Sequence, residues 1–164
     1  MNIWVLQSDD RESYRNFSKI MYQEWSRYII WSLEDVLSKT EQDRSKILND
    51  DIVFAIHENN IIIWSCKLVL NWWSEFAHLI KLSSLYILEE YRGKSYWEQL
   101  MKNVDTRISE QDTYEKMRFF VRNDNKVAIS LYEKLWLRLV GVLEKEWKID
   151  WQYFDEAIYE KVYV

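Results

Sequence analysis

Between residues 82 and 122 the sequence changes from a strand pattern to a helix pattern and back to a strand pattern. Leu82–Leu88 and Lys116–Arg122 are short runs rich in apolar and β-forming residues, which is typical of buried strands. Between them, Ser95 to about Glu110 repeats apolar residues on one helical face. A strand, a helix and a second strand in this order form a crossover that makes the two strands parallel. This feature excludes an all-helical fold and a purely antiparallel sheet.

The rest of the chain alternates strand and helix patterns. Ile52–His57 and Ile61–Leu70 flank the turn-forming residues Glu58-Asn59-Asn60 and predict a β-hairpin. The other predicted elements are a strand at Ile3–Leu6, a helix beginning at Ser8-Asp9-Asp10, a helix that Ser32 and Asp35 open and that runs to Leu37, a helix capped by Asn125, and strands at Leu137–Glu144 and Tyr153–Val162. Residues 40–51 are predicted as a loop with one helical turn near Ile47. We therefore expect an α/β fold (an α+β mixed sheet) with six to seven mostly antiparallel strands, one parallel pair and about four helices.

Length and composition predict one domain over residues 1–164, in which an N-terminal strand and helices (1–50) precede a larger core (51–164). Apolar residues make up 48% and the net charge is −5, which argues against disorder, nucleic-acid binding and membrane binding. Met1–Asp10 lacks a secretory signal, and the single cysteine Cys66 excludes an internal disulfide. With only His57 and His78 besides, a metal site is not expected. These features favour a cytoplasmic protein.

The segment from Leu85 to Leu100 carries the strongest chemical signal in the chain. It is a buried strand that runs through a basic turn with Arg92 and Lys94 directly into a helix, and Ser95 with Glu98 fits a capping box at the helix start. The free N–H groups and the positive dipole end of such a helix, beside two cations, can bind an anion such as a pyrophosphate. The alternative is that Arg92 and Lys94 form an ordinary solvated turn.

This segment resembles the acetyl-CoA-binding motif of the GNAT superfamily of N-acetyltransferases, a strand followed by R/Q-x-x-G-x-G/A. A second stretch, Asn125 to Leu137, resembles that family's N-x-x-A-x-x-L-Y-E-K-L-G-F segment. The resemblance extends from about Ile52 to the C-terminus, whereas residues 1–50 match only by the order of their elements. It implies a GNAT fold with acetyl-CoA as the co-substrate and no metal.

The resemblance also implies roles for individual residues. The acyl and pantetheine parts of acetyl-CoA would lie along the backbone of Leu85, Tyr86 and Ile87, and Asn125 would contact the pantetheine arm. The pyrophosphate would lie on the turn and helix start, which comprise Gly93, Lys94, Ser95, Tyr96, Trp97 and Glu98, and Arg92 would also contribute to cofactor binding. Tyr132 would be the general acid that protonates the departing thiolate, because a phenol is neutral at pH 7 and has a pKa near that of a thiol. The alternative for Tyr132 is a core aromatic side chain.

The implied reaction is transfer of an acetyl group to a primary amine in a ternary complex, with a backbone N–H of Leu85–Leu88 stabilising the oxyanion. The acceptor, a small molecule or a peptide N-terminus, would be selected by the N-terminal helices and by residues 71–75. Candidates for the general base are Glu75, His78, Glu89 and Glu90, although a water chain could serve instead. Cys66 lies in an apolar strand and is expected to be an inert core thiol. A homodimer through the C-terminal strands is compatible with the fold.

The chain departs from the family pattern mainly at glycine positions. Ser95 and Trp97 occupy the two glycine positions after Arg92, and tryptophan also replaces glycine at positions 64, 136 and 151. Ser95 is expected to compensate as a helix cap. Trp97 is harder to accommodate, because an indole brings about 150–250 Å² of surface where the backbone should approach the cofactor.

Two explanations follow for these tryptophans. The cofactor pocket is degenerate and the protein is a catalytically inactive acyl-CoA-binding or regulatory module, or UGA codons that encode glycine in the source organism stand here as tryptophan. The 2 glycines and 10 tryptophans together come close to the number of glycines that average usage predicts, about 11. We therefore hypothesise that most of the tryptophans are glycine in the organism.

Overall fold

The computed structural model describes residues 3–28, 33–71, 73–135 and 137–163 and has one seven-stranded sheet. In spatial order its strands are β1 (Ile3–Val5), β2 (Ile52–Glu58), β3 (Ile61–Val69), β4 (Leu79–Ile87), β5 (Lys116–Arg122), β7 (Gln152–Val162) and β6 (Arg138–Ile149). The helices are α1 (Arg11–Trp25), α2 (Leu33–Ser38), α3 (Glu41–Asp50), α4 (Tyr96–Ser109) and α5 (Lys126–Lys134). The expected fold class is confirmed, and the residues predicted as a β-hairpin and as parallel strands form those pairs.

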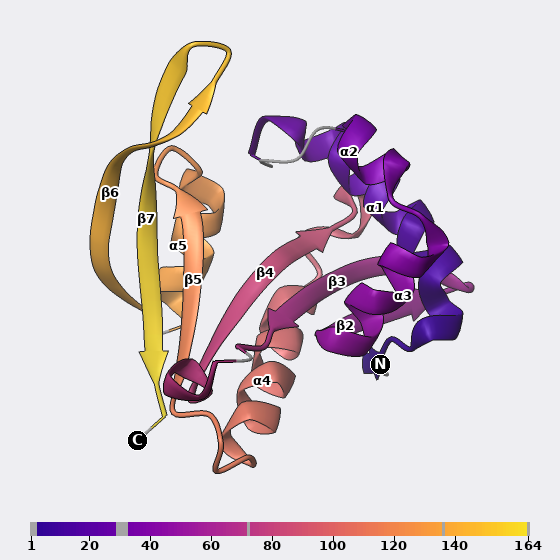
Figure 1. Cartoon of the computed structure of the whole chain (residues 1–164), viewed down its shortest axis with the longest axis horizontal. Helices are drawn as coiled ribbons and strands as arrows, with labels where there is room; N and C mark the ends of the chain where they lie inside the picture. Colours follow the sequence, from indigo (N-terminus) through magenta and orange to yellow (C-terminus); the bar gives the residue numbers. More distant parts are fainter. Residues whose placement is uncertain (1–2, 29–32, 72, 136, 164) are drawn as a thin grey trace.

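Strands β4 and β5 are the parallel pair, and their pairing is short. It extends from Leu79 opposite Lys116 to Leu82 opposite Phe119. Beyond these residues the two strands diverge, β4 toward α1 and β5 toward the β6–β7 hairpin (Figure 1). The other neighbouring strands pair antiparallel. The sheet is therefore split at the carboxyl ends of its two central strands, which is the place where α/β sheets bind ligands.

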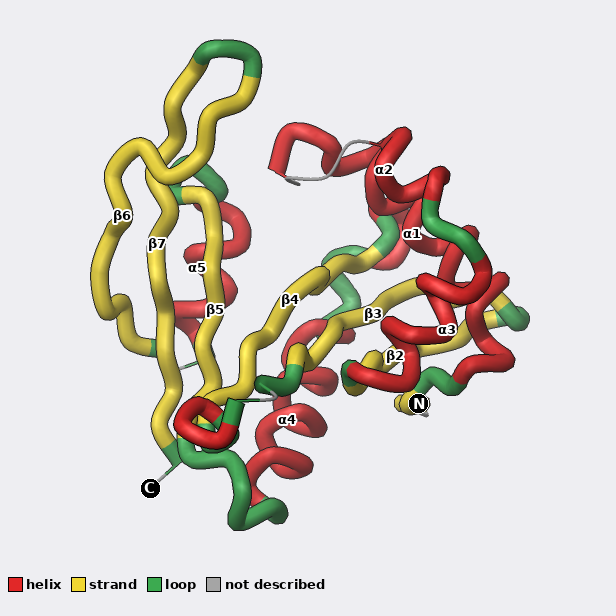
Figure 2. The backbone as a smooth tube through the Cα atoms, in the orientation of Figure 1, coloured by secondary structure: helices red, strands yellow, loops and turns green. Residues whose placement is uncertain are grey.

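Helices cover both faces of the sheet (Figure 2). The side chains of β2 alternate between these faces, so that Phe54 and Ile56 pack in the core under α4 and α5, whereas Val53 and Ala55 pack under α1 and α3. The β2 sequence is apolar at consecutive positions because both of its faces are buried. The molecule thus has two hydrophobic layers that share one sheet.

The prediction of a loop at residues 40–51 was wrong, because Glu41–Asp50 forms α3. Thr40 caps this helix: its hydroxyl accepts from the Asp43 N–H, and the Asp43 carboxylate accepts from the Thr40 N–H. The reciprocal cap stabilises a helix whose sequence is mostly polar. Arg44 and Leu48, four residues apart, form its buried face. The Ser32 part of the other predicted cap lies outside the described residues.

Candidate active site

The open edge of β4 begins immediately after the last parallel pair. A β-bulge interrupts its pairing with β3 here, and Ser84 adopts a left-handed conformation with φ of +51°. Leu88 donates its N–H to Ile63 on β3. Because N–H groups alternate between the two edges of a strand, the N–H of Ile87 is directed away from β3, toward the split. Of the three residues predicted to face acetyl-CoA, Ile87 therefore has its N–H on the open edge.

The N-terminus of α4 presents backbone N–H groups without a cap. No acceptor among the described residues serves the N–H groups of Tyr96, Trp97 and Glu98, since the first bond of the helix is from Gln99 to the Ser95 carbonyl at 3.3 Å. The predicted capping box is wrong, because Ser95 has φ of +56° and its side chain makes no cap. Gly93 also has positive φ, at +77°. The uncapped N–H groups are suited to bind an anionic group.

Arg92 is held on the α1 side of this turn rather than over the helix start. Its guanidinium donates to the Ile87 carbonyl at 3.2 Å and to the Tyr86 hydroxyl at 2.9 Å, and it lies 3.6 Å from the Glu24 carboxylate. Tyr86 donates in turn to Glu24. Arg92 therefore fixes the end of β4 to α1 by three polar contacts. The neighbouring Lys94 places its ammonium 5.1 Å from the Tyr91 ring centroid.

Tyr132 lies over the point where the sheet splits. Its ring centroid is 4.9 Å from that of Phe119, the last β5 residue paired with β4, and 6.1 Å from the ring of Trp97 in the first turn of α4. Its hydroxyl makes no hydrogen bond to any described residue. Burial raises the pKa of Tyr132 above its usual value of 10.0. The phenol is therefore protonated at neutral pH and free to donate its proton to a ligand.

Asn125 begins α5 as the sequence predicts. Its side-chain oxygen accepts from the Ala128 N–H at 3.2 Å, and the residue is buried. The oxygen is thus used in capping, whereas its amide NH₂ keeps two donors. This cap positions α5 and, about two turns later, Tyr132.

A family model described as "Acetyltransferase (GNAT) family" matches residues 11–135. The chain belongs to the GNAT acetyltransferase family. No curated protein sequence matches the chain. A GNAT acetyltransferase from Streptococcus pneumoniae has a similar structure, with a TM-score of 0.88, 16% identity and 98% of each chain covered. So do ribosomal-protein-alanine N-acetyltransferase from Brucella melitensis, with a TM-score of 0.82, 15% identity and 99% of each chain covered, and the yncA protein of Salmonella typhimurium, solved with its cofactor acetyl-CoA. The last has a TM-score of 0.81 and 12% identity over 99% of this chain and 94% of that one.

Three of the tryptophans at positions where the resemblance leads us to expect glycine lie in surroundings that suit an indole poorly. Trp64 and Trp97 are buried, and their indole nitrogens have no hydrogen-bond partner among the described residues. A buried donor without a partner costs about 1–3 kcal/mol. Trp151 is 86% exposed with φ of +68°, a conformation that penalises a residue with a β-carbon. Trp136 lies outside the described residues.

The structure separates the candidates for the general base. Glu75 and His78 precede β4, so the parallel pairs from Leu79 to Leu82 lie between them and the split along the strand. Glu89 and Glu90 are exposed on the turn that follows β4.

Sequence reasoning missed Glu24, the carboxylate that contacts Tyr86 and Arg92. No motif marks Glu24, because its partners are more than 60 residues away on β4 and the following turn.

Two further observations concern reactive side chains and membrane segments. Cys66 is fully buried, and burial raises the pKa of its thiol, which keeps it protonated. Within the described ranges, no group of three or more His, Cys, Asp or Glu side chains could hold a metal ion. None of the helices described is both long and apolar enough to cross a membrane.

Proposed function

We propose that the protein transfers the acetyl group of acetyl-CoA to a primary amine. The observation that carries this proposal is the position of Tyr132, between the split of β4 from β5 and the uncapped start of α4. An anionic group at α4 and an acyl group at the open edge of β4 would then lie on either side of a free phenol. Membership of the GNAT family and the structural similarity to the acetyl-CoA complex support the same reaction.

Each part of this site has one task in the proposed reaction. The N–H groups of Tyr96, Trp97 and Glu98 bind the pyrophosphate, with Lys94 beside them. The amine nitrogen attacks the thioester carbonyl carbon, and the N–H of Ile87 stabilises the negative charge on its oxygen. As the carbon–sulfur bond breaks, Tyr132 donates its proton to the sulfur and the amine loses a proton to water, and water then returns a proton to Tyr132. Arg92 holds the end of β4 in place through the Ile87 carbonyl.

Acetyl-CoA binding tests the first half of the proposal. At about 100 times its Kd the ligand should stabilise the protein by about 2.7 kcal/mol, which thermal unfolding detects. Lys94→Glu places a negative charge beside the pyrophosphate and should weaken binding at least tenfold. Lys102→Glu makes the same charge change within α4, six residues after Tyr96, and should change the affinity less than threefold. Equal effects of the two variants would contradict binding at the start of α4.

Release of coenzyme A tests the second half. A panel of primary amines, amino acids and short peptides should include acceptors that release it in the presence of acetyl-CoA. Formation of the acetylated amine in equal amount, measured by mass spectrometry, distinguishes transfer from hydrolysis. Binding of acetyl-CoA without transfer to any amine would overturn the enzymatic proposal.

A second candidate function is an inactive acyl-CoA-binding or regulatory module. The buried indole of Trp97 favours it, because this side chain occupies space between the start of α4 and Tyr132. The two candidates differ in what Trp97→Gly does: it restores turnover if the indole is the obstacle, and leaves the protein inactive if the catalytic groups do not act.

A cytoplasmic location and a homodimer are part of the same proposal. The outermost strand β6 carries exposed Leu139, Val140 and Val142, which could pair with a second copy. Sedimentation of the protein, compared with a Val140→Lys variant, tests the dimer: a dimer through β6 dissociates in the variant, and a monomer in both cases excludes it.

A further inference from the structure

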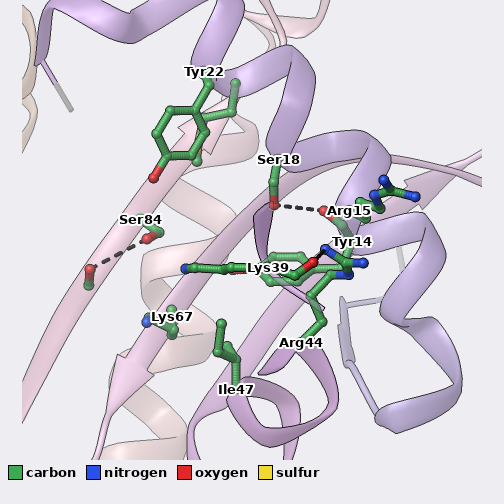
Figure 3. Close-up of a pocket in the computed structure, with 11 residues that line it drawn as sticks. Tyr14, Arg15, Ser18, Tyr22, Lys39, Arg44, Ile47, Lys67 and Ser84 are labelled. Carbon is green, nitrogen blue, oxygen red and sulfur yellow. Dashed lines mark hydrogen bonds between the residues drawn. The ribbon is translucent and has the colours of Figure 1, made fainter. Parts of the chain in front are cut away.

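A pocket lies on the α1 face of the sheet, on the opposite side from α4 (Figure 3). It is an open pocket with a cavity volume of about 100 Å³, between α1, α3, β3 and β4. Four cationic residues from four places in the chain line it: Arg15 on α1, Lys39 before α3, Arg44 on α3 and Lys67 on β3. No Asp or Glu among the described residues lines it. This clustering of positive charge stands out in a chain whose net charge is −5.

Two of these cations, Arg15 and Arg44, have guanidinium N–H groups without an acceptor among the described residues. Asp51 pairs with Lys67 at 3.3 Å and offsets its charge. Arg44 is 8% exposed and its side chain, in the described part of the chain, donates only to the Lys39 carbonyl, although a guanidinium has five N–H donors. The buried Nε of Arg15 has no acceptor among the described residues. Desolvated cations with unused donors are costly, and an anion in the pocket would satisfy them.

The pocket also reaches the proposed site of acetyl transfer. Ser83 and Ser84 form part of its wall, and they directly follow Leu82, the last β4 residue paired with β5. Figure 3 shows the ammonium end of Lys39 directed toward the side where Lys67 and Ser84 lie. A molecule bound by these cations can therefore extend along the β4 bulge toward the split. The start of α4 approaches the split from the other face.

We propose that this pocket binds the anionic group, a carboxylate or a phosphate, of a small-molecule amine acceptor. This inference rests on the proposed acetyl transfer and names its substrate class. The anion contacts Arg44, Lys39 and Lys67, and the amine of the same molecule reaches the split through the β4 bulge. Simple amines without an anionic group lack these contacts and are poorer acceptors.

Matched ligand pairs test the proposal without acetyl-CoA. O-Phosphoethanolamine should bind at least tenfold more tightly than ethanolamine, and β-alanine more tightly than propylamine, as measured by calorimetry. Because the contacts are ionic, the preference should decrease as salt is raised from about 0.05 to 0.5 M. Equal affinity for the members of each pair would overturn the proposal.

Matched variants locate the binding. Lys39→Gln and Arg44→Gln should each weaken O-phosphoethanolamine at least tenfold and raise its KM in the coenzyme A release assay, with acetyl-CoA affinity unchanged. Lys46→Gln removes an exposed cation from α3 outside the pocket. It should change neither the affinity for O-phosphoethanolamine nor its KM more than twofold. Lys39 is half-buried in a loop, so its variant remains informative if Arg44→Gln fails to fold.

The outcomes separate the two proposals. Acetyl-CoA binding and turnover with neutral amines, with no effect of the Lys39 variant, would overturn the anion pocket and leave acetyl transfer intact. Anion binding that depends on Lys39 in a protein that never binds acetyl-CoA would overturn acetyl transfer and leave the pocket as an anion site.

Discussion

The indole of Trp97 packs against the phenol ring of Tyr132, with 6.1 Å between the ring centroids and 41° between the planes. This contact joins the start of α4, where the pyrophosphate of acetyl-CoA is proposed to bind, to the proposed general acid on α5. The other rings in contact with Tyr132 in the described part of the chain, those of Phe119 and Tyr159, come from the sheet, whereas Trp97 comes from α4. If acetyl-CoA binds as proposed, the indole of Trp97 therefore limits the space that it has beside Tyr132.

Trp97→Gly should increase the affinity for acetyl-CoA at least tenfold, because it removes the indole between α4 and Tyr132. The loss of a buried aromatic side chain should also lower the free energy of unfolding, by about 3–5 kcal/mol for a well-packed site. Calorimetric titration and urea unfolding measure the two effects separately. Trp25, which packs on the α1 side, provides the control: Trp25→Gly should destabilise without improving acetyl-CoA binding. Tight binding of acetyl-CoA by the parent chain would show that Trp97 does not obstruct the acetyl-CoA site.

Trp151→Gly should raise the free energy of unfolding by about 0.5–1 kcal/mol. Asp150 and Trp151 both have positive φ in the β6–β7 turn, a geometry that favours glycine, and the 86% exposed indole loses little packing. Urea unfolding measures the change. Trp4 is exposed in β1 without a positive φ, so Trp4→Gly should instead lower stability. A loss of stability in both variants would show that the turn has no preference for glycine.

The gene offers a direct test of the codon hypothesis. UGA codons are expected at positions 64, 97, 136 and 151, and mass spectrometry of the native protein should then find glycine there. Standard tryptophan codons at these positions would leave the degenerate pocket as the explanation.

The sequence predicts the sheet and the start of α4 well, because both depend on local patterns. The same reasoning misassigns Ser95, since its left-handed backbone reflects the turn that joins β4 to α4 rather than any capping preference. It misses α3, whose polar sequence becomes helical through the Thr40–Asp43 cap and the packing of Leu48 under α1. Sequence patterns do not predict the cationic pocket either, because Arg15, Arg44 and Lys67 come together only when α1 and α3 pack on β3.

Acid should destabilise the protein through Glu160. This 4% exposed carboxylate lies 2.5 Å from Arg118 Nη2 and 3.4 Å from Lys116 Nζ. Burial alone would raise its pKa, but the two cations lower it below the usual 4.5. A pKa lowered by folding gives stability that is present above about pH 4.5 and is lost as the pH falls through the folded value. Glu160→Gln should therefore cost about 1–3 kcal/mol at pH 7 and less below pH 4. The exposed Glu144→Gln is the control, and a cost that does not depend on pH would contradict the role of the charge.

Tyr132→Phe distinguishes catalysis from packing. The change removes the hydroxyl and keeps the ring, so the contacts with Phe119, Trp97 and Tyr159 remain and stability should change little. If Tyr132 protonates the leaving sulfur, kcat should fall by about 10²–10⁴ while acetyl-CoA affinity stays within about twofold. Because burial raises the pKa of Tyr132, its ionisation should not limit the parent enzyme between pH 6 and 9. Tyr159→Phe makes the same chemical change on β7 and should leave kcat within a few-fold. Tyr132→Phe should be introduced into the more active form of the protein. This is the Trp97→Gly variant if that variant binds acetyl-CoA more tightly than the parent chain. An unchanged kcat for Tyr132→Phe there would assign the proton donor to another group and leave Tyr132 as a core side chain.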